Sequence, residues 1–285
     1  MSAAANRATS AVNRDALAGA PFFQVADVPA PGLFTLDGPE GRHAATVRRM
    51  RVGEVLVLTD GAGRLASATV VAVGHGSVDV TVEPAWDESL PQVRVTLVQA
   101  LPKGDRSELA VELATEAGVD AVVPWAASRC VARWVGDKAD KGVRRWQLIA
   151  GQAAKQSRRS TVPPVRPLAS TADVVRLIQS AAGALVLHEG GSVPIAQVPL
   201  PSSGSLLLVI GPEGGISPAE LAVFTDAGGH VVRLGAEVLR TSTAAAVALG
   251  ALGVLTGRWS APKPDTATAE ETAASPGAAS VEPRP

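Results

Sequence analysis

Residues 205–220 read SLLLVIGPEGGISPAE, and this stretch decides the fold class. Residues 206–210 are apolar without a break, which is typical of a parallel strand covered by helices on both faces. A glycine-rich turn follows at residues 211–215. Ser217 and Glu220 then flank Pro218 in the pattern of a capping box with proline in the first helical turn. The stretch therefore predicts a buried strand, a tight loop and a helix, which is the repeating unit of an α/β sheet.

The same alternation continues on both sides of this unit. Apolar runs predict strands at residues 93–100, 121–125, 184–188, 205–210 and 230–234. Helices are expected at residues 106–117, 141–156, 171–182, 218–227 and 241–255. In the first of these helices, Leu109, Leu113 and Ala117 form the expected core-facing stripe. We therefore expect residues 91–260 to form an α/β domain with right-handed connections.

Residues 20–88 have a different pattern. Short β-branched runs predict strands at residues 22–25, 53–59, 65–73 and 77–82, with one short helix at residues 43–50. Short strands at close spacing favour a small β-barrel, and residues 86–91 are expected to link it to the next domain. Residues 1–19 and 261–285 lack a clear apolar period, so we expect a disordered N-terminal extension and a disordered tail.

Composition limits the classes of protein. Hydrophobic residues make up 46% of the 285 residues, which allows full cores, while the formal net charge of -1 gives no global sign of a nucleic-acid partner. Cys130 is the only cysteine and no Cys/His cluster has zinc spacing, so we expect no metal. The sequence contains neither a signal-peptide pattern nor an apolar run of membrane-spanning length, so we expect a cytoplasmic protein that does not enter a membrane.

Three predicted loops at strand ends carry residues that could bind a ligand or act in catalysis. The GPEGG loop at 211–215 lies where α/β sheets bind ligands, but it matches neither a dinucleotide fingerprint nor a phosphate loop. In the second loop, Arg240 precedes a helix rich in alanine and glycine. In the third, His188 and Glu189 could act in acid–base chemistry. Each loop taken singly also has a structural explanation. The GPEGG loop could be an ordinary tight turn, and the second loop could reflect helix packing, with Arg240 in a surface salt bridge. His188 and Glu189 could simply be polar residues of a turn.

One segment is strongly basic. Residues 129–166 contain ten Arg and Lys residues against Asp137 and Asp140, a local net charge of +8. Trp134 and Trp146 lie among these cations. A solvated helix face would account for most charge runs, but one basic segment in a near-neutral chain favours a surface that binds RNA phosphates.

Together these motifs resemble the RsmE family of small-subunit ribosomal RNA uridine-N3 methyltransferases, within the SPOUT superfamily. The glycine loop is shared across the superfamily, whereas the order of seven pieces is specific to the family. The chain departs from the family in the length of both ends and at Lys155, where many relatives carry Glu. The seven pieces are His43 with VRRMRVG at 47–53, QALPKGD at 99–105, ATEAGVD at 114–120, AKQSRR at 154–159, LHE at 187–189, IGPEGGIS at 210–217, and Leu234 with VLRTSTA at 238–244.

The resemblance implies a fold and a reaction. It implies an N-terminal PUA-like β-barrel and a C-terminal SPOUT-type α/β domain whose chain end forms a trefoil knot that holds S-adenosylmethionine. It implies methylation at N3 of uridine 1498, in bacterial numbering, of 16S rRNA within the small ribosomal subunit. It also implies a homodimer with RNA spanning both subunits. The alternatives are another SPOUT enzyme, acting on the ribose 2′-O or guanosine N1 of transfer RNA, and a non-catalytic RNA-binding assembly factor.

Loop position and resemblance together assign roles to individual residues. Arg240, Glu213 and His188 are the catalytic candidates, with the proton acceptor left open between Glu213, His188 and water. Arg158 and Arg159 join Arg240 as candidates for the positive field at the uridine. The predicted RNA-binding residues are Arg48, Arg49, Lys103, Arg129, Arg133, Lys155, Arg158 and Arg159. The predicted cofactor-binding residues are Leu187, His188, Glu189, Gly190, Ile210, Gly211, Pro212, Glu213, Gly214, Gly215, Leu234, Gly235, Val238, Leu239, Arg240, Thr241 and Ala244.

Overall fold

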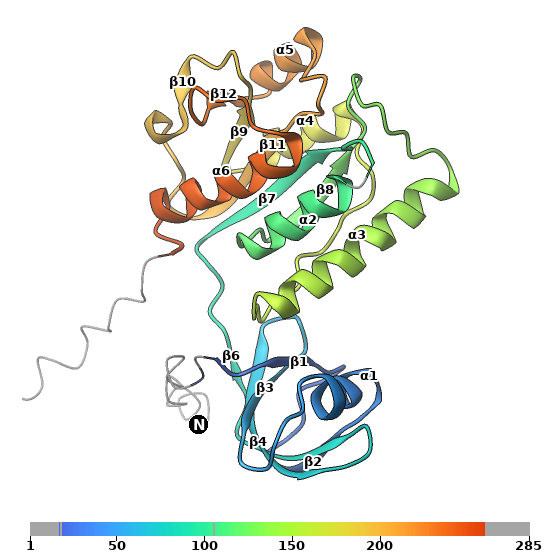
Figure 1. The fold of residues 1–285 in the computed structure, drawn as a ribbon. Helices are drawn as coiled ribbons and strands as arrows, with labels where there is room; N and C mark the ends of the chain where they lie inside the picture. Colours follow the sequence, from blue (N-terminus) through green and yellow to red (C-terminus); the bar gives the residue numbers. More distant parts are fainter. Residues whose placement is uncertain (1–16, 18, 105, 260–285) are drawn as a thin grey trace, which may run out of the picture.

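The computed structural model describes residue 17, residues 19–104 and residues 106–259. Apart from residues 17 and 19, the ends that were expected to be disordered lie outside this range. The described chain forms two sheets, one from the N-terminal residues and one from the residues after Val93 (Figure 1). No helix in the described ranges is both long enough and apolar enough to span a membrane.

The N-terminal sheet has six strands, β1 (Phe22–Gln24), β2 (Gly32–Leu36), β3 (Val55–Thr59), β4 (Arg64–Val73), β5 (Val78–Val82) and β6 (Trp86–Asp87). Their order is β1-β3-β4-β5-β2, and β6 pairs with β4. The helix expected at residues 43–50 is α1 (Gly38–Arg42) continued by the π-helical turn η2 (His43–Val47). Strand β2 was not predicted, because Pro29, Pro31 and Gly32 break the pattern ahead of an edge strand. Strand β6 was expected to be part of the linker.

The C-terminal sheet is fully parallel. Its strands are β7 (Val93–Ala100), β8 (Ala121–Trp125), β9 (Gly183–Leu187), β10 (Val193–Pro194), β11 (Gly204–Ile210) and β12 (His230–Arg233), in the order β10-β12-β9-β11-β7-β8. Residues 206–210 of β11 are all buried between β7 and β9, as their apolar run predicts. The α/β class expected for this domain is confirmed.

Five α-helices cover this sheet: α2 (Arg106–Glu116), α3 (Asp137–Gln156), α4 (Thr171–Ser180), α5 (Pro218–Asp226) and α6 (Thr241–Leu255), with a 3-10 turn η3 (Ile195–Gln197) before β11. Figure 1 shows α6 and α2 in front of the strands and α4 behind them. Helix α2 buries Ala110, Val111 and Ala114, while Leu109 is 41% exposed. The expected stripe is therefore wrong at Leu109, because α2 presents small residues to the alanine-rich α6.

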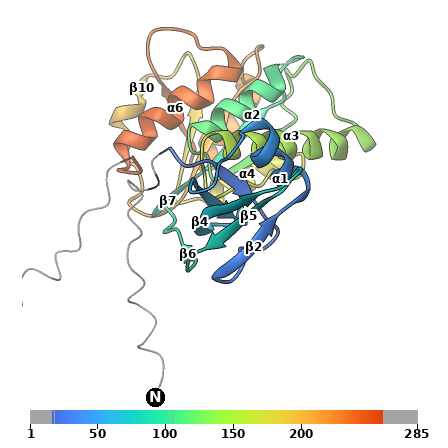
Figure 2. The ribbon, with the colours of Figure 1, turned by 60° about the horizontal axis from the view of Figure 1, so that its bottom comes forward.

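The two sheets are joined by more than the linker. Lys155 at the end of α3 pairs with Glu40 of α1 at 2.6 Å, and Figure 2 shows α1 close to one end of α3. The backbone N–H of Gly63 and the Thr59 hydroxyl both donate to the Ser160 carbonyl, each at 3.1 Å. Residues 155–160 therefore dock the C-terminal part of the basic segment on the N-terminal domain.

Candidate functional site

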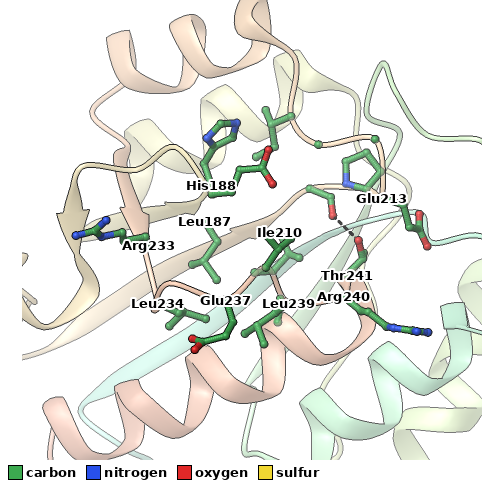
Figure 3. Close-up of a pocket in the computed structure, with 18 of the residues that line it drawn as sticks. Leu187, His188, Ile210, Glu213, Arg233, Leu234, Glu237, Leu239, Arg240 and Thr241 are labelled. Carbon is green, nitrogen blue, oxygen red and sulfur yellow. Dashed lines mark hydrogen bonds between the residues drawn. The ribbon is translucent and has the colours of Figure 1, made fainter.

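A cavity of about 460 Å³ lies at the carboxyl ends of β9, β11 and β12. Its walls are the loop after β9, the glycine loop after β11 and the irregular chain between β12 and α6 (Figure 3). This size is within the range of pockets that bind small molecules and cofactors. The carboxyl edge of a parallel sheet is where α/β folds bind ligands.

The cavity collects the residues that were predicted from sequence. Of the predicted cofactor-binding residues, all but Gly190 line it. Arg129, which was predicted to face RNA, also lines it. Sequence reasoning missed Ile216, Val232, Arg233 and Glu237, although each lies within two positions of a predicted residue. The structure thus brings together three segments that are far apart in the chain.

The glycine loop is shaped by close backbone contacts. A Cβ on Gly211 would lie 2.6 Å from Ile216 Cγ1, and Gly215 has a φ of 72°. Only glycine tolerates the close contact at position 211 and the positive φ at position 215 without strain. The Thr241 hydroxyl donates to the Gly211 carbonyl at 3.1 Å and so fixes the start of α6 against this loop. The loop and the helix start therefore form one connected wall.

The turn after β9 determines what His188 can do. The backbone N–H of Gly190 donates to His188 Nδ1 at 3.0 Å, and the backbone N–H of His188 donates to the Val232 carbonyl at 3.0 Å. A ring nitrogen that accepts a hydrogen bond carries no proton, so a neutral His188 carries its proton on Nε2. In this arrangement His188 offers the pocket a donor rather than a base.

Glu213 and Arg240 lie at one end of the pocket, and His188 lies in another part of it (Figure 3). Glu213 Oε1 accepts from the backbone N–H of Lys103 at 3.2 Å and lies 4.0 Å from an Arg106 guanidinium nitrogen. The carboxylate thereby ties the loop after β7 to the glycine loop. Arg240 is exposed and occupies the N-cap of α6 without a side-chain capping bond.

The lining of the pocket is mixed in polarity. Its charged members are balanced in sign, and its other members include several large apolar side chains. Such a lining suits a ligand that has an apolar part and charges of both signs. The charged residues are Arg129, Arg233, Arg240, Glu189, Glu213 and Glu237; the large apolar ones are Leu187, Ile210, Ile216, Val232, Leu234, Val238 and Leu239.

Two of the predicted RNA-binding cations are engaged at the junction between the sheets. Lys155 pairs with Glu40. Arg159 donates to the Thr115 carbonyl at 2.7 Å and to the Thr161 hydroxyl at 3.4 Å, and burial lowers the pKa of its guanidinium. Both side chains therefore hold the structure together. In contrast, the exposed cations among the predicted set are Arg48, Arg49, Lys103, Arg129, Arg133 and Arg158.

The two tryptophans of the basic segment are structural. Trp146 is 1% exposed and donates from Nε1 to the Ser107 hydroxyl at 2.8 Å. Trp134 packs edge-to-face against Trp146, with ring centroids 5.1 Å apart. Arg145 beside them forms an ion pair with Glu108 of α2 at 2.7 Å. The local charge of the segment is thus partly neutralised by residues outside it.

Two of the exposed arginines have unusual backbone conformations. Arg49 has a φ of 53° and Arg158 a φ of 55°, and they are the only non-glycine residues with positive φ in the described ranges. Arg158 directly follows the C-cap Ser157 of α3, the position where helices most often use glycine. Strained residues cluster at functional sites.

Comparison with known proteins agrees with the division of the fold. Residues 88–253 match the family model of the RNA methyltransferase domain, and residues 36–83 match that of the RNA methyltransferase PUA domain. Ribosomal RNA small subunit methyltransferase E of Mycobacterium tuberculosis is 55% identical over 251 residues, covering 86% of this chain and 95% of that protein. The protein of the same name from Bacillus subtilis is 33% identical over 242 residues, covering 82% and 93%.

Solved structures give the same result. Ribosomal RNA small subunit methyltransferase E from Neisseria gonorrhoeae, solved with bound S-adenosylmethionine, has a TM-score of 0.71 at 28% identity and covers 83% of this chain and 98% of its own. A Legionella pneumophila methyltransferase solved with the same cofactor has a TM-score of 0.71 at 29% identity, covering 82% and 97%. With its PUA domain and its methyltransferase domain, this chain belongs to the family of ribosomal RNA small subunit methyltransferase E, as its motifs predicted.

Proposed function

We propose that this protein transfers a methyl group from S-adenosylmethionine to N3 of one uridine of 16S rRNA, position 1498 in bacterial numbering. The observation that carries the proposal is the cavity built by the loops after β9, β11 and β12. All three loops contain motifs of the family to which the chain belongs. The solved relatives that bind S-adenosylmethionine have the same overall fold.

The residues of the cavity fit this cofactor. Its adenine and thioether carbons suit the apolar wall that Leu187, Ile210 and Leu239 provide. Its ammonium and carboxylate suit a lining with three glutamates and three arginines. The lining glycines Gly211, Gly214 and Gly215 present backbone groups rather than side chains to the pocket, so a ligand can approach the main chain closely. We assign the predicted cofactor-binding residues to this pocket on that basis.

The chemistry explains why a cationic site is needed. The bound cofactor would supply an electrophilic methyl group on sulfur, so the transfer needs no metal. Uridine N3 carries a proton and takes part in base pairing, so the nucleotide must be unpaired and turned into the site. Positive charge near O2 or O4 stabilises the anion that forms when the proton leaves. Arg240, at the mouth of the cavity, is the residue that we assign to this role.

Two residues are candidates for accepting the proton from uridine N3. His188 Nδ1 accepts from the Gly190 N–H, which leaves Nε2 of a neutral ring as a donor, so His188 suits binding better than proton abstraction. Glu213 has Oε1 engaged by Lys103, which leaves Oε2 as the atom that could take the proton. We therefore favour Glu213 over His188, with direct loss to water as the remaining route.

We assign RNA binding to the exposed cations of both domains, Arg48, Arg49, Lys103, Arg129, Arg133 and Arg158. Contacts to phosphates supply most of the affinity of such surfaces and are released by salt. We do not assign this role to Lys155 and Arg159, which were also predicted from sequence to bind RNA, because their side chains are already paired. Lys155 joins the two domains through Glu40, and Arg159 joins the segment after α3 to α2 through Thr115.

The remaining features are proposed for the assembled enzyme. Residues 20–88 would close into a PUA-like barrel, and residues 91–260 would form a SPOUT domain in which the chain between β12 and α6 passes through a trefoil knot. A homodimer is supported by exposed apolar residues on α6, where Val254 is 71% and Val247 48% exposed. A ribosomal RNA substrate also implies that the enzyme works in the cytoplasm, on the small subunit.

One experiment tests the function. Small ribosomal subunits that lack the modification are incubated with the protein and methyl-labelled S-adenosylmethionine, and the product is mapped by mass spectrometry. N3-methyluridine at a single site of 16S rRNA is the expected result. A ribose methyl group or N1-methylguanosine would assign a different reaction of the superfamily. No transfer, with RNA binding retained, would indicate a non-catalytic assembly factor.

A further inference from the structure

A buried carboxylate lies beside the pocket without lining it. Glu220, in the first turn of α5, is only 5% exposed. Its Oε1 accepts from the backbone N–H of Ser128 at 2.7 Å and from the Thr171 hydroxyl at 3.4 Å. Its Oε2 accepts from the Ser128 hydroxyl at 2.9 Å and from the Ser217 backbone N–H and hydroxyl at 3.0 and 2.7 Å. One side chain thus connects the loop after β8, the start of α4 and the end of the glycine loop.

These hydrogen bonds keep the carboxylate ionised. Burial alone would raise the pKa of Glu220, but the donors on Ser128 and Ser217 together outweigh burial and hold the pKa below its ordinary value. Each oxygen accepts one backbone N–H, from Ser128 on Oε1 and from Ser217 on Oε2. Only a side chain with two acceptor oxygens satisfies both.

Helix capping does not explain the contacts with Ser128. Helix α4 begins with the same kind of capping box, in which Ser170 and Asp173 exchange hydrogen bonds. Beyond that box, the Asp173 carboxylate contacts only the nearby Arg176 of its own helix, within the described residues. The box at α5 has the additional task of holding a distant loop, 92 residues away in sequence.

The next residue along that loop is Arg129, which lines the pocket. Its Nη1 donates to the Gly214 carbonyl at 3.2 Å, and its own carbonyl and Cβ lie 3.3 Å from where a Cβ on Gly214 would be. Arg129 is exposed and lies in the loop that continues to the exposed Arg133. It is therefore the point where the proposed RNA surface meets the proposed cofactor pocket.

We propose that Glu220 is a positioning residue for binding of the RNA substrate. By holding Ser128, it fixes Arg129 on the glycine loop. There the Arg129 guanidinium contacts the phosphate backbone of the nucleotide that enters the pocket. The inference rests on the proposed function. It predicts that Glu220 influences the RNA substrate through Arg129 and has little influence on cofactor affinity.

The test uses Glu220→Gln in the full-length protein. Glutamine has one acceptor oxygen, so either the Ser128 N–H or the Ser217 N–H loses its acceptor. We expect KM for unmodified small subunits to rise about tenfold. We expect Kd for S-adenosylmethionine, measured by calorimetry, to change less than about threefold on the same scale. Asp173→Asn is the matched control, because it weakens the equivalent capping box on α4 and should leave both constants unchanged.

A double-mutant cycle decides whether Glu220 acts through Arg129. Arg129→Ala should raise KM for the RNA by itself, and adding Glu220→Gln to it should cause little further change. Fully additive effects, or equal losses of RNA and cofactor affinity, would overturn the proposal. If Glu220→Gln does not fold, Ser128→Ala takes its place in the cycle, because it removes one bond and leaves the capping box intact. Failure of the wild-type protein to methylate RNA at all would instead refute the proposed function.

Discussion

Arg158 gives a prediction in which stability and RNA binding change in opposite directions. Its φ of 55° is in the left-handed region, directly after the C-cap of α3. That conformation costs a residue with a side chain about 1 kcal/mol or more, and it costs glycine almost nothing. Glycine also gives the unfolded chain extra entropy worth about 0.4–1 kcal/mol. Arg158→Gly should therefore leave the free energy of unfolding unchanged or raise it by up to about 1 kcal/mol.

The same substitution removes one proposed phosphate contact. The slope of log affinity for RNA against log salt should become shallower by about 0.7–0.9. Urea unfolding and RNA titrations over a range of salt concentrations measure the two effects. Arg158→Ala is the matched control, since it removes the charge and keeps the strain, so its free energy of unfolding should be equal to that of the glycine variant or lower by up to about 1 kcal/mol. A glycine variant that is strongly destabilised, or that binds RNA with the wild-type salt slope, would refute the reasoning.

Three further substitutions test other parts of the structure. Gly214→Val should abolish cofactor binding in calorimetry while circular dichroism remains that of the folded protein, because its Cβ would already lie 3.3 Å from Arg129; tight binding would contradict the pocket. Lys155→Ala leaves Glu40 unpaired at a partly exposed junction, so the free energy of unfolding measured in urea should fall by about 1 kcal/mol. Lys155→Met keeps an apolar chain without the charge, so it tests whether packing of that chain alone maintains the stability. The lowered pKa of Glu220 stabilises the fold above the ordinary glutamate pKa of about 4, and this contribution is lost as pH falls through the folded-state pKa. Glu220→Gln should therefore lose less stability than the wild type on acidification to about pH 3, and parallel pH profiles would contradict this assignment.

Local pattern was enough to predict most of the α/β domain. The bounds of β7, β8 and α6 agree with the predicted ranges, because continuous apolar runs and clear helix starts mark them. Strand β2 and the two-residue β10 escaped prediction, since proline, glycine and short length obscure edge strands. Helix α3 starts at Asp137, four residues before the predicted start, after Gly136 with a φ of 55°.

The pocket was predictable because its residues lie at strand ends, where parallel topology brings them together. The roles of Lys155 and Arg159 could not be predicted, because their partners are distant in sequence. Lys155 and Glu40 are 115 residues apart, and Arg159 and Thr115 are 44 apart. A charge count over residues 129–166 contains no sign of these contacts, so it overestimates the cations that are available to RNA.

The most direct test of the account is a crystal structure of this protein with S-adenosylhomocysteine, the product that the proposed reaction leaves behind. We predict that the ligand lies between the loops after β9, β11 and β12, with its sulfur turned toward the end of the pocket that holds Arg240. Density for the ligand at any other place, or a pocket filled by the side chains of Leu187 and Leu239 at saturating ligand, would contradict the central claim.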